Sequence, residues 1–400
     1  MLIGIVGKPN CGKTTLLNAA CLTTAKVADY PFTTIEPNLG TAYVRSPCVC
    51  KELKVKDNPK NSICLNGIRL IPIELLDVAG LVPGAWEGKG LGNQFLDDLR
   101  RADALIHVVD ASGSTDAEGK IAEPGTWDPL EDIKFLEYEI AMWISNIIKR
   151  DWSKFTRKIE VEHLSFVEMM AKRLTGLGIE KSHINDALRQ TKLIETKPAK
   201  WKDEEIYEFS AALRKISKPL LIIANKADMK TSEYNIKRIK EFTDQFVIPA
   251  CALGEYHLRK FAESEKINYK PGDPAFEIPK PEVFSEQELK VLNNLQNLMQ
   301  KLGSTGVQEA LDTVVFKLLE RIVVYPVHEV SSLSDKDGNV LPDAFLIPKG
   351  TNIKNVAAKI HTELAETFIH GIDAKTKKRL SENYEVKNCD VVKFVSAKGH

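Results

Sequence analysis

One segment of eight residues constrains the fold of this chain more than any other part of its sequence. The segment fits the pattern G-x-x-x-x-G-K-[ST] and is Gly7-Lys8-Pro9-Asn10-Cys11-Gly12-Lys13-Thr14. It follows the apolar run Leu2–Val6 and opens a stretch of helical composition, Lys13–Ala25. A glycine-bearing loop between a strand and a helix directs backbone N–H groups at phosphate oxygens. We therefore expect a phosphate-binding loop here.

The residue types within this loop suggest separate tasks. Gly7 and Gly12 permit backbone angles and a close approach that other residues hinder. Lys13 is expected to place its ammonium group on the β- and γ-phosphates of a nucleotide, and the Thr14 hydroxyl to bind Mg²⁺. The other loop residues expected to contact the nucleotide are Lys8, Pro9, Asn10, Cys11 and Thr15.

Further apolar runs continue the alternation of strand and helix. Buried-strand patterns occur at Arg69–Leu76, Ala104–Val109 and Leu220–Ala224. Short apolar strands separated by helical stretches predict an α/β fold with a doubly wound, mostly parallel sheet. From about Asp128 to Lys215, apolar residues recur at helical spacing. This interval predicts an inserted α-helical domain, built as an antiparallel, coiled-coil-like helix pair.

The chain changes character again beyond residue 262. A proline-rich linker comes first, and helical stretches follow it. From Val323 a turn at Asp335–Gly338, an apolar strand, a helix and a final alternating strand predict a small β-grasp domain. We expect five regions: a nucleotide domain in two parts (1–127 and 216–262), the insertion (128–215), linker and helices (263–322), and the β-grasp domain (323–400).

A second nucleotide motif, Asp77-Val78-Ala79-Gly80, ends the Arg69–Leu76 strand. The Asp77 carboxylate can hold the hydration shell of Mg²⁺, and the Gly80 N–H can donate to the γ-phosphate. Alone this motif is weak, but it becomes specific when it is paired with the phosphate loop.

The segment Tyr30–Asn38 lies between these two motifs and contains adjacent threonines. A threonine in a mobile loop at this place can bind Mg²⁺ and sense the γ-phosphate. We select Thr34 rather than Thr33 for this role. The plainer interpretation is a proline-containing surface turn.

A third motif, Asn225-Lys226-Ala227-Asp228, follows the strand Leu220–Ala224. The Asp228 carboxylate can accept hydrogen bonds from the N1–H and 2-amino groups of guanine, and adenine would leave a buried carboxylate unpaired. The stem of Lys226 can lie over the base, and Asn225 can tie this loop to the phosphate loop. Further along, Cys251 and Ala252 occupy the place of a Ser-Ala-Lys loop, where the Ala252 N–H would reach the guanine oxygen.

Composition excludes several classes of protein. No apolar run approaches the ~20 residues of a membrane span, and the N-terminus lacks the features of a secretory signal. Lys and Arg total 55 and so do Asp and Glu, which excludes a global polycation made only to coat nucleic acid. Seven cysteines, an odd number, favour a reducing cytoplasm over a disulfide scaffold.

Individual cysteines and histidines give weaker signals. Cys48, Cys50 and Cys64 lack a fourth ligand at zinc-site spacing, so ordinary thiols are expected. Cys11 stands at a helix N-terminus, a position that favours a lowered thiol pKa and sensitivity to oxidation. His107 is expected to be a hydrogen-bonded core residue.

Four stretches together carry a family resemblance: GKPNCGKTT, YPFTTIEPN, DVAGLVPGAWEGKGLGNQFLDDLRRAD and NKAD. They resemble the Obg-related GTPases, and most closely the YchF branch of Obg-like ATPases. The segment that begins AFLIPKGTNIKNVAAKI resembles a TGS domain, the ubiquitin-like module of that superfamily. The resemblance covers essentially the whole chain.

The resemblance implies a cytoplasmic, Mg²⁺-dependent enzyme that hydrolyses GTP to GDP and phosphate. It also implies a ribosome or RNA partner, contacted through the helical insertion and the TGS domain, and no membrane. Leu81 stands where Ras-like GTPases have a glutamine that positions water, so slow intrinsic hydrolysis is expected. Asn10 occupies the loop position that provides a K⁺ ligand in potassium-activated relatives, so K⁺ is a possible second cofactor.

Two alternatives stay open. The first is an ATP-preferring enzyme, because YchF relatives carry a non-standard base motif that tolerates ATP, although this chain has the ordinary motif with Asp228. The second is a nucleotide-gated RNA- or ribosome-binding module with negligible turnover. The basic residues of the insertion and of the turn at Lys375–Arg379 fit either an RNA-facing surface or a solvated face.

Overall fold

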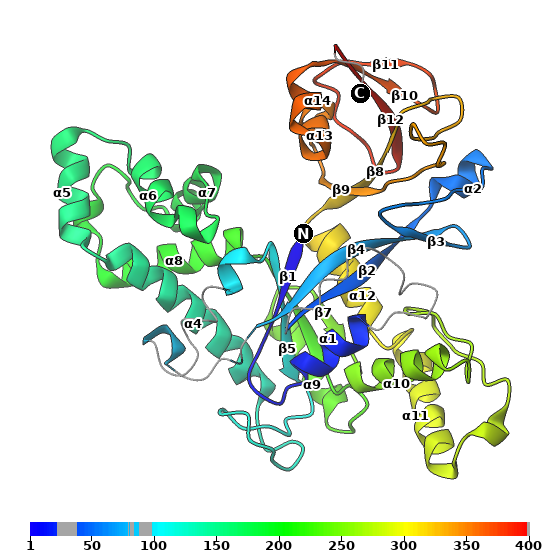
Figure 1. Cartoon of the computed structure of the whole chain (residues 1–400). Coiled ribbons are helices and arrows are strands. Elements are labelled where there is room, and N and C mark those ends of the chain that lie inside the picture. The colour runs from blue at the N-terminus through cyan, green and yellow to red at the C-terminus, as the bar shows by residue number, and fades with distance from the viewer. Residues whose placement is uncertain (22–37, 79, 81–83, 88–97, 398–400) are drawn as a thin grey trace. The chain divides into compact units, whose positions relative to one another are not determined.

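The structure is a computed structural model that describes residues 1–21, 38–78, 80, 84–87 and 98–397. The chain forms two compact units. The first unit comprises residues 1–40 and 74–310, and the second comprises residues 41–73 and 311–400. Figure 1 shows both units, with most of their helices and strands labelled.

The first unit is built on a parallel sheet, as the sequence predicts. Its strands are ordered β4-β1-β5-β6-β7, and each neighbouring pair is parallel. Their bounds are β1 (Leu2–Val6), β4 (Ile68–Asp77), β5 (Ala104–Asp110), β6 (Leu220–Asn225) and β7 (Val247–Pro249). Every residue of β1, β5 and β6 is buried, which is typical of parallel strands covered on both faces. The carboxyl ends of the strands therefore meet at one edge, where nucleotide sites form in such folds.

Helices of the insertion continue the core of this sheet. They are α4 (Pro129–Lys149), α5 (Trp152–Glu162), α6 (Phe166–Leu174), α7 (Lys181–Thr191) and α8 (Asp203–Ser217). One apolar cluster runs from Leu105 and Val109 of the sheet through Ile133 and Ile140 of α4 to Phe209 of α8. The insertion and the sheet are thus held by one continuous core.

The expected antiparallel pair is present as α4 and α8. Glu137 of α4 meets Arg214 of α8, and Lys149 near the end of α4 meets Asp203 at the start of α8. Three more helices, which the sequence analysis did not separate, lie between them along the chain (Figure 1). Their core is aromatic, because Trp152, Phe155, Phe166, Trp201 and Phe209 make ring contacts.

The rest of the first unit is helical. Its elements are α1 (Lys13–Cys21), α9 (Ser232–Phe242), α10 (Ala252–Glu263), α11 (Glu286–Leu302) and the start of α12 (Val307–Asp312). The predicted extension of α1 to Ala25 lies outside the described residues. Ser285 caps α11 in a reciprocal arrangement with Glu288, which fixes where this helix begins. Among the described helices, none has the length and apolarity needed to cross a bilayer.

The second unit contains a five-stranded sheet ordered β11-β10-β12-β8-β9. Its elements are β8 (Arg321–Val327), β9 (Phe345–Pro348), α13 (Ile353–Ile360), α14 (Thr362–Glu366), β10 (Phe368–Asp373), β11 (Arg379–Leu380) and β12 (Asp390–Ser396). Strands β8 and β12 are parallel and the other pairs are antiparallel, around a core that includes Val324, Ile353 and Val392. This is the predicted β-grasp arrangement, with β10 and β11 as additional strands.

Residues 41–73 also belong to the second unit. They contain most of β2 (Leu39–Pro47), then α2 (Val49–Leu53), β3 (Ile63–Leu65) and the first part of β4. Strand β3 pairs with β4 in an antiparallel hairpin whose turn uses Asn66 and Gly67, both with positive φ.

Candidate nucleotide-binding site

The phosphate loop joins β1 to α1, and its backbone requires glycine at two places. Gly7 has φ of 148°, and a Cβ there would lie 2.5 Å from the carbonyl oxygen of Val108. Gly12 has φ of 105°, and a Cβ there would lie 2.2 Å from Nδ2 of Asn225. Backbone or buried side-chain atoms cannot yield at such distances, so the loop packs closely against β5 and β6 only because side chains are absent.

Lys13 holds its ammonium group over the loop. The Nζ atom donates to the carbonyl oxygen of Lys8 at 2.9 Å, and the side chain is buried. A methyl group at Gly80 would lie 3.3 Å from the same Nζ. The two residues expected to meet the γ-phosphate are therefore neighbours, and Thr34, the third, lies outside the described residues.

Thr14 and Asp77 are in direct contact, since the Thr14 hydroxyl donates to Oδ2 of Asp77 at 2.5 Å. The other carboxylate oxygen, Oδ1, is buried and has no hydrogen-bond partner among the described residues. Hydroxyl and carboxylate oxygens are the donors that Mg²⁺ prefers. The pair thus fits a magnesium site, and the unpartnered oxygen is a place for a ligand of the ion or one of its waters.

Lys8 is turned away from the loop. Its Nζ atom donates to the carbonyl oxygen of Thr115 at 2.8 Å and pairs with the Asp132 carboxylate at 2.9 Å. The side chain is buried, so only the backbone of Lys8 is left to contact a phosphate. Burial raises the pKa of Asp132 to about 6 in spite of the lysine. Sequence reasoning missed Asp132, because an acidic residue in the first turn of a helix is ordinary and its partner is 124 residues away.

Asn225 ties the phosphate loop to the loop after β7. Its Nδ2 donates to the carbonyl oxygen of Cys11 at 2.9 Å, and its Oδ1 accepts from the backbone N–H of Ala252 at 3.1 Å. The tie to the phosphate loop is the one expected from the sequence. The same Asn225 oxygen accepts the Ala252 N–H that we expect to reach the guanine oxygen, and that role of Ala252 stays a prediction.

Lys226 is anchored by a buried carboxylate. It has φ of 59°, and its Nζ donates to Oδ2 of Asp110 at 2.8 Å and to Oγ of Ser114 at 3.1 Å. Burial pushes the pKa of Asp110 upward, but hydrogen bonds from Lys226, Ser112 and Thr115 bring it below its ordinary value. Asp110 thus stays charged and fixes the lysine stem. Asp110 is the last residue of β5, and this position at the carboxyl end of a parallel strand could have identified it as a site residue.

Asp228 is exposed, whereas the sequence argument treated it as a buried carboxylate. One of its oxygens, Oδ1, accepts a hydrogen bond from the thiol of Cys251 at 3.2 Å. Cys251 is buried and its sulfur accepts the N–H of Gly254 at 3.3 Å, so it also caps α10. Burial raises the pKa of Cys251, which keeps it a hydrogen-bond donor. The carboxylate is therefore accessible and oriented by a thiol.

Cys11 corrects another expectation. The side chain is fully buried, and this burial raises the pKa of Cys11 to about 11 although Lys13 acts in the opposite direction. The helix N-terminus and the nearby lysine do not outweigh desolvation. A reactive thiolate at this position is therefore not supported.

Asn10 is exposed, and its Nδ2 donates to the carbonyl oxygen of Gly119 at 2.9 Å.

A buried carboxylate of α4 holds the segment that follows the Asp77–Gly80 motif. The backbone N–H groups of Gly84 and Trp86 donate to the two oxygens of Glu139, at 2.8 and 3.0 Å. Glu139 is also a residue that the sequence analysis missed, since a glutamate within an amphipathic helix is normally placed on the solvent face.

Comparisons with known proteins agree with this arrangement. A family model described as a 50S ribosome-binding GTPase matches residues 2–139, and one for an Obg-like GTPase, YGR210-like, G4 motif-containing domain matches residues 223–329. A TGS domain model matches residues 336–396.

Individual relatives match this chain over much or nearly all of its length. The uncharacterized GTP-binding protein MJ1332 of Methanocaldococcus jannaschii is 50% identical over 397 residues, with 99% of each chain covered. The ribosome-binding ATPase YchF of Bacillus subtilis is 30% identical over 285 residues, 66% of this chain and 68% of that one. A crystal structure of a GTP-binding protein from Pyrococcus horikoshii is 38% identical with a TM-score of 0.79, covering 99% of this chain and 100% of that one. The resemblance seen in the motifs is thereby confirmed: the chain belongs to the Obg-like, YchF-related family of P-loop GTPases with a C-terminal TGS domain.

Proposed function

We propose that this protein binds GTP with Mg²⁺ and hydrolyses it slowly to GDP and phosphate. The observation that carries the proposal is the position of Asn225, which joins the phosphate loop and the loop after β7 by bonds of 2.9 and 3.1 Å. A single ligand with a phosphate end and a base end would span these loops. The name of the M. jannaschii relative, a GTP-binding protein, supports the same assignment.

Each group of the site has a role in this proposal. Lys13 and the loop N–H groups offset the charge on the β- and γ-phosphates. Thr14 and Thr34 bind Mg²⁺, and Asp77 holds the water molecules of the ion. The ion, when bound, neutralises charge on the β- and γ-oxygens. The Gly80 N–H donates to the γ-phosphate and thereby distinguishes GTP from GDP.

Guanine selection is assigned to Asp228. Its exposed carboxylate can accept from N1–H and the 2-amino group, and adenine offers no matching donor pair. The alternative, ATP, is favoured by the B. subtilis relative, which is named an ATPase. A competition assay with labelled GDP tests the choice: GTP should displace it at concentrations at least about a hundredfold lower than ATP.

The same assay includes two variants. Asp228→Ala should remove the preference for guanine, while Asp337→Asn, which changes an exposed aspartate of the second unit, should leave it intact. Equal displacement by both triphosphates in the unmodified protein would overturn the assignment to GTP.

Hydrolysis is proposed to be slow because Leu81, which lies outside the described residues, cannot hydrogen-bond an attacking water. K⁺ is a candidate activator, since the Asn10 side chain is exposed and its Nδ2 is tied to Gly119, so that its oxygen end can bind a cation. Single-turnover rates should be higher in K⁺ than in Na⁺, and Asn10→Ala should remove the difference. Equal rates in both salts would remove K⁺ from the proposal.

A ribosome or RNA partner in the cytoplasm is proposed from charge and from the names of relatives. Lys154, Arg157 and Lys158 of α5 are exposed, and so are Lys377, Lys378 and Arg379 of the second unit. The B. subtilis relative is named a ribosome-binding protein. Co-sedimentation with ribosomes should weaken steeply as salt rises, and charge reversal of α5 should reduce it. If the protein does not co-sediment with ribosomes even at low salt, the ribosome partner is excluded. The proposal that the protein binds GTP would be unaffected.

A further inference from the structure

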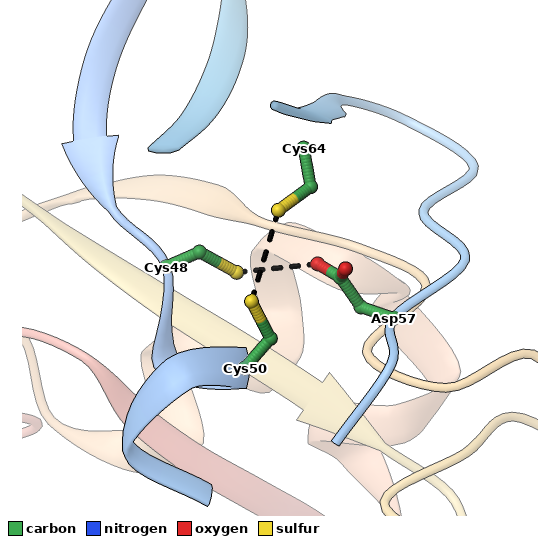
Figure 2. Close-up of side chains that lie close together, drawn as sticks. All are labelled: Cys48, Cys50, Asp57 and Cys64. Atoms are coloured by element: carbon green, nitrogen blue, oxygen red, sulfur yellow. Dashed lines mark hydrogen bonds between the residues drawn. The ribbon is translucent and has the colours of Figure 1, made fainter. Parts of the chain in front are cut away.

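Three cysteines and an aspartate converge in the second unit. Cys48 and Cys50 lie at the start of α2, and Cys64 lies in β3. Asp57 belongs to the loop that joins α2 to β3. One ligand atom from each residue lies within 4.8 Å of the other three. Figure 2 shows the three sulfur atoms and the carboxylate pointing toward a common centre.

The sequence analysis expected ordinary thiols here, because it found no fourth ligand. Asp57 supplies that ligand. It stands midway between Cys50 and Cys64, and a carboxylate at this spacing belongs to none of the common zinc patterns. Only the folding of the loop onto α2 and β3 shows that it joins the cysteines.

The distances agree with a tetrahedral metal site. Zn–S bonds of about 2.3 Å at tetrahedral angles separate two sulfur atoms by about 3.8 Å, and a sulfur from a carboxylate oxygen by about 3.5 Å. The Sγ atoms of Cys50 and Cys64 are 3.7 Å apart, and Cys48 Sγ is 3.2 Å from Oδ2 of Asp57. A disulfide between Cys50 and Cys64 would need about 2.0 Å, so these thiols are unbonded.

The surroundings can accept the charge of such a site. Three thiolates and one carboxylate exceed the charge of a divalent ion, and Arg69 contributes a compensating positive charge. Its guanidinium is fully buried, and Nη2 lies 3.1 Å from Oδ2 of Asp57. Thiols lose their protons when they bind a metal, so occupation of the site would release protons.

We propose that Cys48, Cys50, Asp57 and Cys64 bind one Zn²⁺ ion as a closed, structural site. Four protein ligands leave no open position, which is the arrangement of structural rather than catalytic zinc. Thiolate ligands exclude Mg²⁺ and Ca²⁺, which prefer oxygen. The ion connects α2, the following loop and β3, a stretch with little regular structure of its own.

Metal content of the full-length protein tests the proposal directly. After purification with Zn²⁺ present and thorough dialysis, elemental analysis should find about one zinc per chain. Cys50→Ser and Cys64→Ser should lower this content severalfold or abolish it. Cys389→Ser, which removes a half-buried cysteine of the same unit outside the cluster, should leave it unchanged. Retained hydrogen-exchange protection in β8, β9 and β12 would serve as the check that the second unit of the variants is folded.

Co²⁺ provides a spectroscopic readout that does not depend on the stability of the variants. The cobalt-loaded protein should show the intense visible bands of a tetrahedral site and thiolate charge-transfer bands. Asp57→Cys should retain the metal and add charge-transfer intensity. The proposal is overturned by zinc-free protein that takes up no Co²⁺, by an octahedral spectrum, by iron as the resident metal, or by a Cys50–Cys64 disulfide in the isolated protein.

Discussion

Asn225 uses both ends of its side-chain amide to hold the nucleotide site together. The donor end holds the carbonyl of Cys11 in the phosphate loop, and the acceptor end holds the N–H of Ala252 at the start of α10. The residue is buried, so neither partner can turn to water if the amide is removed. An unpaired buried donor or acceptor costs about 1–3 kcal/mol.

Asn225→Ala should therefore lower GDP affinity by about a hundredfold, since two backbone groups lose their partners and the loops lose their tie. Titration calorimetry measures the change. Asn235→Ala is the matched control, because Asn235 is a buried asparagine that donates to the backbone of Ala111 without contacting the phosphate loop. It should destabilise the fold and leave GDP affinity within a few-fold. Equal losses of affinity in both variants would contradict the role given to Asn225.

His107 differs in part from what its sequence position indicates. It is a core residue of β5, as expected, but its Nδ1 is buried without a hydrogen-bond partner among the described residues. Burial is the main cause that lowers the pKa of His107 to about 3, and Lys13, Arg214 and Lys8 act in the same direction. A charged imidazole is therefore excluded from the folded protein at neutral pH.

Stability should fall on acidification because of this residue. Between pH 6.5 and pH 3 the unfolded chain binds a proton at His107 that the folded chain does not, so the free energy of unfolding decreases as pH falls. The loss at pH 5 is about 2 kcal/mol relative to pH 7. Asp132, with a raised pKa of about 6, changes stability in the opposite sense between pH 6 and 4 and partly offsets it.

His107→Leu should reduce the drop in melting temperature between pH 7 and pH 5, and His163→Asn, which changes an exposed histidine, should not. An unchanged drop in the leucine variant would show that acid sensitivity arises elsewhere.

Helix α4 touches the site at two places on one face. Asp132 binds Lys8 of the phosphate loop, and Glu139, two turns further along, binds the backbone of Gly84 and Trp86. The helix thus links the phosphate loop to the segment that follows the Asp77–Gly80 motif.

Glu139→Gln should weaken GTP binding more than GDP binding. The glutamine amide nitrogen would face one of the two backbone N–H groups, so one bond is lost and the segment after Gly80 is held less firmly. A several-fold change in the ratio of the two affinities is expected from titration with both nucleotides. Glu137→Gln, on the same helix but bonded to Arg214, is the control and should leave the ratio unchanged. A parallel loss for both nucleotides in Glu139→Gln would indicate general destabilisation only.

Local signals explain which elements the sequence predicts. The sequence predicts the phosphate loop, β5 and β6, because an apolar run and the motif next to it can both be recognised within a few residues. The helices α5, α6 and α7 were not separated, since their boundaries depend on residues such as Asp151 and His163 that adopt left-handed backbone conformations without being glycine. The partners Lys8–Asp132 and Gly84–Glu139 were also missed, because charged side chains usually face water and only the folded chain shows that these are buried.

At the scale of the whole molecule, residues distant in sequence complete each unit. In the second unit Arg69 donates to Ser62 and to the carbonyl of Leu341, pairs with Asp57, and lies over the ring of Tyr325 at 5.3 Å. Residues 41–73 are therefore part of the core of this unit, together with residues 311–400. Motif spacing gives no sign of this, because these contacts join segments more than two hundred residues apart.

Arg69→Met should selectively destabilise the second unit. In the metal-free protein, removing one partner of this buried pair leaves Asp57 uncompensated and costs about 3–5 kcal/mol. In thermal unfolding followed by hydrogen exchange, protection should fall in β8, β9 and β12 and persist in β1 and β5, because each unit has its own core. Lys60→Met, which breaks an exposed pair with Asp335 in the same unit, should change protection little. Uniform loss of protection in both units would mean that they unfold as one cooperative body, and the arginine would then stabilise the whole chain rather than the second unit alone.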